Sequence, residues 1–299
     1  MTTRDWMLIA FLSLIWGGSF FFAEVALLAY GPLTVVALRV SLAAAILLVI
    51  LRVTGKALPR GWGIWGALAV MGLLNNVFPF SLIVWGQVHV TSSIASIFNA
   101  TTPLFTVFVA HLLTTDERMT VNKLVGVLLG IAGVVVMIGP SALAGFDMAN
   151  AGQVAVLGGA LSYAFASIWG RRLKGLTPMV AAAGMLLMAS VVMIPAALLA
   201  EQPLEVVPSP SVIASVIGLA SVSTALAYLI YFRLLATAGS TNLMLVTLLI
   251  PISAMALGIS FLDETPGAYA YAGMLLIFAG LISVDGRLYR KFRGAGPTV

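Results

Sequence analysis

The sequence predicts an all-α, polytopic membrane protein with ten transmembrane helices. Hydrophobic residues make up 61% of the 299-residue chain and charged residues only 8%, whereas soluble domains carry about 25% charged residues. A soluble fold of this size would have too little polar surface to face water. Long apolar runs joined by short polar connections suit a bilayer, because a helix satisfies its own backbone groups in lipid.

The ten predicted spans follow from the length of each apolar run. A helix that crosses the hydrocarbon core needs roughly 20 apolar residues. The first run is longer than a signal-peptide core and no small-residue cleavage site follows it, so we expect it to be retained. The spans are 6–28, 34–52, 63–86, 92–113, 121–139, 152–171, 178–199, 211–234, 240–261 and 267–285.

The basic residues predict how these spans are oriented. If the N-terminus is cytoplasmic, 14 of the 15 lysines and arginines fall on the cytoplasmic side, and the outer segments contain acidic residues but no lysine or arginine. This is the pattern of the positive-inside rule, and one missed or invented helix would destroy it. Both termini are therefore expected in the cytoplasm. Arg39 is the exception, because it lies within the second span.

Residues 1–139 and 140–299 are predicted to be two copies of one five-helix unit. An acidic pair and two glycines recur at an offset of 147 residues, as Asp116-Glu117, Gly126 and Gly133 and then as Asp263-Glu264, Gly273 and Gly280. Because each unit has five spans, the second enters the membrane in the opposite orientation. Inverted repeats of this kind are typical of secondary transporters.

Polar and aromatic side chains near mid-membrane mark a candidate substrate site. Polar groups at this depth cost free energy and are usually kept for function, although a single Ser or Thr often bonds only the preceding turn. The polar positions fall on spans three, four, eight and nine, which are repeat partners and should converge. The candidate substrate-binding residues are Trp16, Phe20, Asn76, Phe78, Trp85, Ser96, Asn99, Thr102, Tyr163, Trp169, Thr224, Tyr228 and Thr247.

Three prolines and two charged residues complete the predicted site. Pro79, Pro103 and Pro251 interrupt helical hydrogen bonding near mid-membrane and are candidate hinges. Glu24 and Arg39 lie within the first two spans. They are predicted to form an ion pair between these spans, or Glu24 to act as a gate or proton site.

Several function classes lack the residues that they need. The chain has no cysteine and only two distant histidines, His89 and His111, so no disulfide, metal site or thiol nucleophile is predicted. The basic residues do not form a nucleic-acid groove, and no Walker motif is present. We predict no catalytic residue and no cofactor. A membrane-embedded enzyme or lipid transferase is the alternative from another class.

Short motifs give the chain a family resemblance. The run Leu14-Ile15-Trp16-Gly17-Gly18-Ser19-Phe20 is followed by Pro32 and Arg39, and later by Pro103, Asp116-Glu117-Arg118 and the glycines at 126, 130 and 133. Order, spacing and duplication resemble the EamA branch of the drug/metabolite transporter superfamily. The resemblance implies two inverted repeats around a cavity built by helices one, three, four, six, eight and nine, with helices five and ten peripheral.

The resemblance also implies the function of a bacterial inner-membrane exporter. We predict a secondary carrier that exports amino acids, aromatic ones among them, and related small metabolites by alternating access. The absence of an acidic residue at mid-depth favours facilitated transport, and the alternative is a proton-coupled efflux carrier for another substrate class. The expected partners are the small-molecule solute and membrane lipid, with the chain as a monomer or homodimer.

Overall fold

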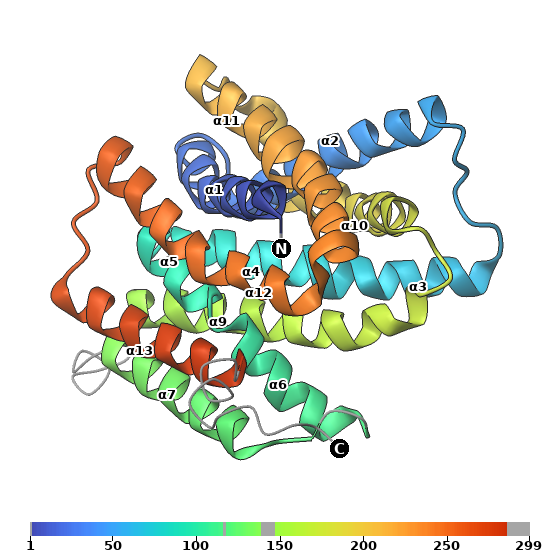
Figure 1. The fold of residues 1–299 in the computed structure, drawn as a ribbon. Helices are drawn as coiled ribbons and strands as arrows, with labels where there is room; N and C mark the ends of the chain where they lie inside the picture. Colours follow the sequence, from blue (N-terminus) through green and yellow to red (C-terminus); the bar gives the residue numbers. More distant parts are fainter. Residues whose placement is uncertain (1, 116–117, 139–146, 286–299) are drawn as a thin grey trace, which may run out of the picture.

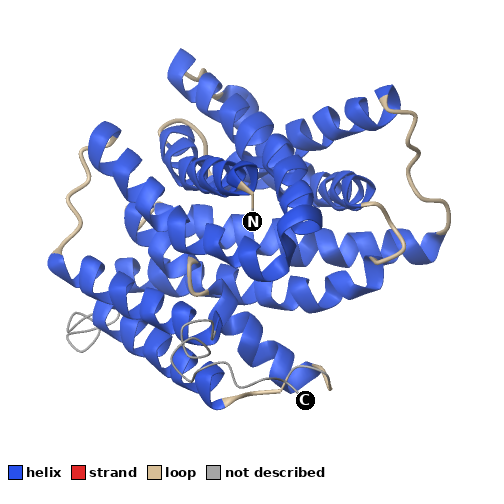
Figure 2. Cartoon of the chain, in the orientation of Figure 1, coloured by secondary structure: helices blue, strands red, loops and turns tan. Residues whose placement is uncertain are grey.

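The computed structural model describes residues 2–115, 118–138 and 147–285 as helices joined by short connections (Figure 2). No strand occurs in that part of the chain. Eight helical segments are long and apolar enough to cross a bilayer, and two shorter apolar helices follow them. These are Thr3–Leu27, Pro32–Val53, Trp62–Gln87, Ser92–Leu113, Val121–Ile138, Met148–Leu173, Pro178–Ala200 and Pro210–Tyr231, then Val246–Phe261 and Ala268–Val284. The predicted all-α, polytopic fold is confirmed.

In the first half, three spans are single helices and two are interrupted. The single helices are α1 (Thr3–Leu27), α2 (Pro32–Val53) and α7 (Val121–Ile138). The third span consists of α3 (Trp62–Gly72), the π-helical turn η1 (Leu73–Val77) and α4 (Phe78–Gln87), and the fourth of α5 (Ser92–Asn99) and α6 (Thr102–Leu113).

The second half repeats this plan (Figure 1). Its first two spans are α9 (Met148–Trp169), ending in the 3₁₀ turn η2 (Gly170–Leu173), and α10 (Pro178–Ala200). After the short turn η3 (Pro203–Glu205) come α11 (Pro210–Ala220), a second π-helical turn η4 (Ser221–Leu226), α12 (Ala227–Phe261) and α13 (Ala268–Asp285). The two π-helical turns thus lie in the third and eighth spans, which are repeat partners.

Helix α12 corrects one predicted boundary. A break was expected between spans 211–234 and 240–261, but helical structure continues from Ala227 to Phe261. A straight helix of 35 residues would be about 52 Å long and would exceed the hydrocarbon core of about 30 Å. Figure 1 shows α12 reversing its direction instead, so the element contains the end of the eighth span and the whole of the ninth.

Two prolines begin new helical segments. Pro79 lies in the first turn of α4, directly after η1, and Pro103 lies in the first turn of α6. The first turn of α6 tolerates proline because its N–H groups have no intrahelical partner there, whereas Pro79 follows η1 without a break and removes one backbone donor from a continuous helix. Pro251, by contrast, lies inside α12. Of the three predicted hinge residues, Pro103 therefore lies at a break between two helices and Pro79 directly after a π-helical turn. Pro251 lies inside a helix that lacks one backbone hydrogen bond as a result.

The fifth helices of the two halves cross in antiparallel fashion. A Cβ atom on Gly126 would lie 2.6 Å from the carbonyl oxygen of Gly280, and one on Gly133 would lie 2.7 Å from that of Gly273. The glycine near the start of α7 thus contacts the one near the end of α13, and the glycine near the end of α7 contacts the one near the start of α13. This exchange is what a two-fold axis between inverted repeats produces.

Other helix pairs follow the same exchange. Helix α2 packs against its own repeat partner α10. The first span contacts the eighth and ninth spans through α11 and α12, and its repeat partner, the sixth span α9, contacts the third and fourth spans through α4 and α6. The acidic pair Asp116-Glu117 lies outside the described residues, so only its repeat partner Asp263-Glu264 is placed.

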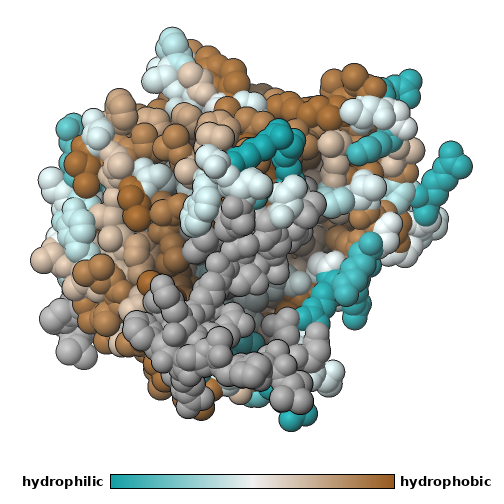
Figure 3. All heavy atoms as spheres, in the orientation of Figure 1, coloured by the Kyte–Doolittle hydropathy of each residue, from teal (hydrophilic) through white to brown (hydrophobic). Residues whose placement is uncertain are grey.

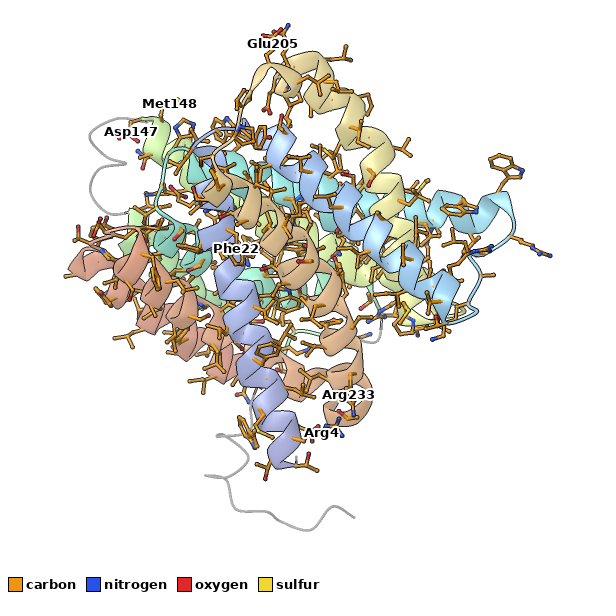
Figure 4. All side chains as sticks on the ribbon, turned by 90° about the horizontal axis from the view of Figure 1, so that it is seen from above. Arg4, Phe22, Asp147, Met148, Glu205 and Arg233 are labelled. Carbon is orange, nitrogen blue, oxygen red and sulfur yellow. The ribbon has the colours of Figure 1, made fainter. Side chains whose placement is uncertain are left out.

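The surface fits a lipid environment along the helices and water at their ends. Large apolar side chains such as Val49, Leu128 and Leu199 are exposed, and apolar atoms cover much of the face in Figure 3. Figure 4 shows Arg4 and Arg233 at one end of the molecule and Asp147 and Glu205 at the opposite end. We call these the basic end and the acidic end. The basic residues at 287–293 lie outside the described residues.

Candidate functional site: a cavity between the two halves

A cavity of about 720 Å³ lies between the helices of the two halves. Sites for small molecules typically occupy roughly 300–1,000 Å³. Its walls come from spans one to four and six to nine, and the lining contains no residue of α7 or α13. This agrees with the expectation that helices five and ten are peripheral, and it adds the second and seventh helices to the wall.

The lining of the cavity extends to the basic end of the molecule. Its lining includes Gly170, Leu173, Lys174 and Leu176, which belong to the turn and connection between α9 and α10. Helix α9 starts at Met148, at the acidic end in Figure 4, so its other end lies at the basic end. Toward the acidic end the lining reaches Gln87, and no connecting segment that the structure describes on that side belongs to it.

Carboxylates cap helix ends at the acidic end and join the two halves there. Glu264 accepts hydrogen bonds from the backbone N–H of Ser92 (2.8 Å) and of Ser93 (3.1 Å), and from both serine hydroxyls. Glu201 accepts from the N–H of Leu33 (2.9 Å) and Thr34 (2.8 Å), at the start of α2. Helix N-termini favour negative charge. Both contacts therefore hold the two halves together at the acidic end.

An amide–hydroxyl network crosses the cavity wall at the two π-helical turns. Asn75 donates from Nδ2 to the Tyr228 hydroxyl (3.0 Å), and Tyr228 donates to Oδ1 of Asn76 (3.2 Å). In η4, Thr224 donates to the carbonyl of Leu219 (2.8 Å). π-Helical turns recur at functional sites because they displace side chains from the regular helix.

Arg39 is the buried charge of the cavity wall. Its side chain is 8% exposed, its Nε donates to Oγ1 of Thr224 (3.0 Å), and its guanidinium carbon lies 3.6 Å from the ring centroid of Phe80. The predicted ion pair with Glu24 is not formed. The Glu24 carboxylate instead accepts from Nε2 of Gln87 (3.0 Å), because Gln87 lies beside it and also donates to the Phe20 carbonyl.

The structure brings eight of the thirteen predicted substrate-binding residues to the cavity wall. They come from the first, fourth, sixth, eighth and ninth spans, as expected from convergence of repeat partners. They are Trp16, Phe20, Asn99, Thr102, Tyr163, Thr224, Tyr228 and Thr247. Arg39 lines the cavity as well, and Glu24 does not.

The other five predicted residues lie outside the lining. Asn76 is fully buried behind Tyr228, and Ser96 is fully buried and bonds the carbonyl of Ser93. Phe78 and Trp85 are 49% and 37% exposed on the outer faces of α4. Trp169 donates from its indole N–H to the carbonyl of Ala67 (3.0 Å) and is not a wall residue. Asn75, one residue before Asn76, and Phe80, two residues after Phe78, do line the cavity.

Sequence reasoning missed several lining residues for identifiable reasons. Gln87 is a lone amide that ends an apolar helix, and such a residue is a usable signal. Phe80 and Met185 give none, because apolar side chains that line a cavity and those that face lipid have the same composition. No group of three or more possible metal ligands occurs among the described residues.

Comparison with known proteins places the chain in context. A model of the EamA-like transporter family matches residues 5–139 and 150–284. A protein of Escherichia coli K12, named as an uncharacterized inner membrane transporter (YedA), is 29% identical over 280 residues, covering 92% of this chain and 89% of its own. A Salmonella typhimurium LT2 protein, named as a probable amino-acid metabolite efflux pump, is 28% identical and covers 99% of this chain and 100% of its own.

A solved structure has a similar fold. Its TM-score is 0.69 and its sequence identity 21%, and the match covers 97% of this chain and 100% of that chain. At this identity the likeness concerns the fold alone. The match nevertheless extends over both halves and therefore over the whole helical arrangement.

Proposed function

Because the chain belongs to the EamA-like transporter family, we propose that it is a secondary carrier that exports amino acids, including aromatic ones, and related small metabolites. The observation that carries this proposal is the cavity between the two inverted halves, whose described lining reaches a connecting segment at the basic end and none at the acidic end. Two equivalent halves can exchange their packing, which would close this end and open the other. Alternating access of a solute follows from that exchange.

The lining supports a small amphipathic solute. Asn75, Asn99 and Tyr228 offer hydrogen-bonding groups, and Trp16 and Phe20 offer aromatic surface. The buried Oδ1 of Asn99 has no hydrogen-bond partner in the protein. A buried acceptor without a partner costs free energy, and the amino group of a bound solute would satisfy it. The relative named as a probable amino-acid metabolite efflux pump supports the same class of substrate.

We further propose that transport is facilitative. The only charged residues in the lining are Arg39 and Lys174, so among these wall residues no carboxylate is available to carry a proton with the solute. A second candidate is proton-coupled efflux through Glu24, which contacts the lining residue Gln87. Replacement of Glu24 by glutamine separates the two, since only the coupled carrier would lose its response to a pH gradient.

In the cell we place the protein in the bacterial inner membrane, with the basic end and both termini in the cytoplasm. The relatives named as inner membrane transporters and the segregation of charge in Figure 4 support this placement. In that orientation the open cavity faces the cytoplasm, where an exporter loads its solute. The functional unit would be a monomer or a homodimer in lipid.

Counterflow in proteoliposomes tests this proposal. Vesicles loaded with each unlabelled amino acid are diluted into the same labelled compound, with and without a pH gradient. We expect transient accumulation of apolar or aromatic amino acids that is the same in both conditions. Failure of every amino acid to exchange would contradict the substrate class, and a requirement for the gradient would contradict facilitated transport.

A further inference from the structure

The positive charge of Arg39 is buried in the membrane without a counter-ion. A charged group at this depth is usually paired with an opposite charge or faces a water-filled cavity. Arg39 faces the cavity, and the acidic candidate Glu24 is bonded to Gln87. Of the other ionisable lining residues, Lys174 has the same sign, and the described lining includes no Asp or Glu. The wall around Arg39 therefore carries uncompensated positive charge.

The contacts of Arg39 fix one part of its guanidinium and leave the rest for a ligand. Thr224 accepts the Nε–H, and the Phe80 ring covers one face of the group. Arginine has five N–H donors in a planar fork, and the Thr224 contact uses one. The Nη groups have no acceptor among the described residues, and such groups fit the two oxygens of a carboxylate.

We infer that Arg39 binds the carboxylate of the transported solute, with Phe80 and Thr224 holding the guanidinium in position. This assignment rests on the proposed carrier function and names the part of the solute that the cavity recognises. One buried cation matches one negative charge. A phosphate group, with a charge near −2 at neutral pH, would keep excess charge in the cavity, so the substrate class is a monocarboxylate with an apolar or aromatic body.

Four solutes with the same phenyl ring distinguish recognition of the carboxylate from recognition of the amino group or the ring. Phenylalanine has a carboxylate and an amino group, phenyllactate has only the carboxylate, and phenylalaninamide and phenethylamine have no carboxylate. Reconstituted wild-type protein should exchange the first two and neither of the last two. Exchange of phenethylamine as fast as that of phenylalanine would overturn the assignment of Arg39.

Variants test the residue itself. R39Q should raise the KM for phenylalanine roughly 10- to 100-fold, which is the usual effect of losing charge-assisted hydrogen bonds. R39K keeps the positive charge but not the planar set of donors, so its KM should lie between those of wild type and R39Q. K56Q removes one exposed positive charge outside the cavity lining and is the matched control, with KM unchanged. An R39Q protein that is folded and has a KM within twofold of wild type would overturn the inference.

A binding measurement keeps this inference distinct from the carrier proposal. The melting temperature of the detergent-solubilised protein is measured with and without phenyllactate. A stabilisation seen in wild type and K56Q and absent in R39Q would support the carboxylate site even if no solute is transported. Equal stabilisation by phenyllactate and phenethylamine in wild type would overturn it, and this comparison needs no variant to fold.

Discussion

The hydroxyl of Tyr228 lies 3.0 Å from the amide nitrogen of Asn75 and links the π-helical turn of one half to the eighth span of the other. The same hydroxyl donates to Oδ1 of Asn76. The two asparagines are adjacent in sequence, yet only Asn75 lines the cavity. The link therefore connects the wall of the cavity to the contact between the halves.

Tyr228→Phe should impair transport more than folding. The substitution keeps the ring but leaves the amides of Asn75 and Asn76 without this partner, which costs about 1–3 kcal/mol for a buried group. We expect the KM of counterflow to rise several-fold. The control is Tyr269→Phe, which removes a hydroxyl from a residue that is 52% exposed on α13. Equal KM values in the two variants would show that Tyr228 only fills space.

Glu264→Gln should lower the thermal stability of the protein. The carboxylate is 8% exposed and caps α5 through Ser92 and Ser93. Loss of a charged N-cap costs about 0.5–2 kcal/mol. The melting temperature in detergent measures the effect, and Glu205→Gln, at an exposed position in η3, is the control. If both variants melt at the same temperature, the capping contact does not stabilise the acidic end.

Gly126→Ala should destabilise the contact between α7 and α13. The added Cβ would lie 2.6 Å from the Gly280 carbonyl oxygen, so the two backbones must move apart. Gly66→Ala is a matched control, because nothing lies within 4 Å of its added Cβ. Alanine is about 1 kcal/mol better than glycine within a helix, so Gly66→Ala should be neutral or stabilising. Stabilisation of the protein by both substitutions would contradict the close crossing.

Single-cysteine labelling should place the two ends of the molecule on opposite sides of the membrane. The natural chain has no cysteine, so Lys56→Cys and Glu205→Cys each give one exposed thiol. In intact cells a membrane-impermeant maleimide should label position 205 and not position 56. Labelling of both positions from outside would remove the inverted arrangement and the alternating-access mechanism with it.

The helices could be predicted from the sequence because length and hydrophobicity decide what crosses a bilayer. The predicted spans match the observed helices to within a few residues at most ends. The reversal within α12 was predicted as a break, because five residues between two apolar runs look like a connection even when helical hydrogen bonding continues through them. The repeat could be recognised from the paired acidic residues and glycines. These residue types recur because a close helix crossing requires glycine and a helix N-terminus favours a carboxylate.

The substrate-binding residues could be predicted from the sequence only in part. Asn99 and Tyr228 were predicted and line the cavity, whereas Phe78 and Trp85 were predicted and face outward. The π-helical turn at Leu73–Val77 shifts the rotation of everything after it. A regular helical repeat cannot show that shift, so the phase of α4 could not be predicted.

The sequence by itself determined that the chain is a membrane protein of two inverted halves, since these properties depend on composition, on the distribution of charge and on an internal repeat. Only the tertiary structure decided which partner each buried polar group finds. Arg39 and Glu24 were expected to pair with each other, but Arg39 contacts Thr224 and Phe80, and Glu24 contacts Gln87. Partners across helices are set by rotation and packing of the spans, which local sequence does not encode.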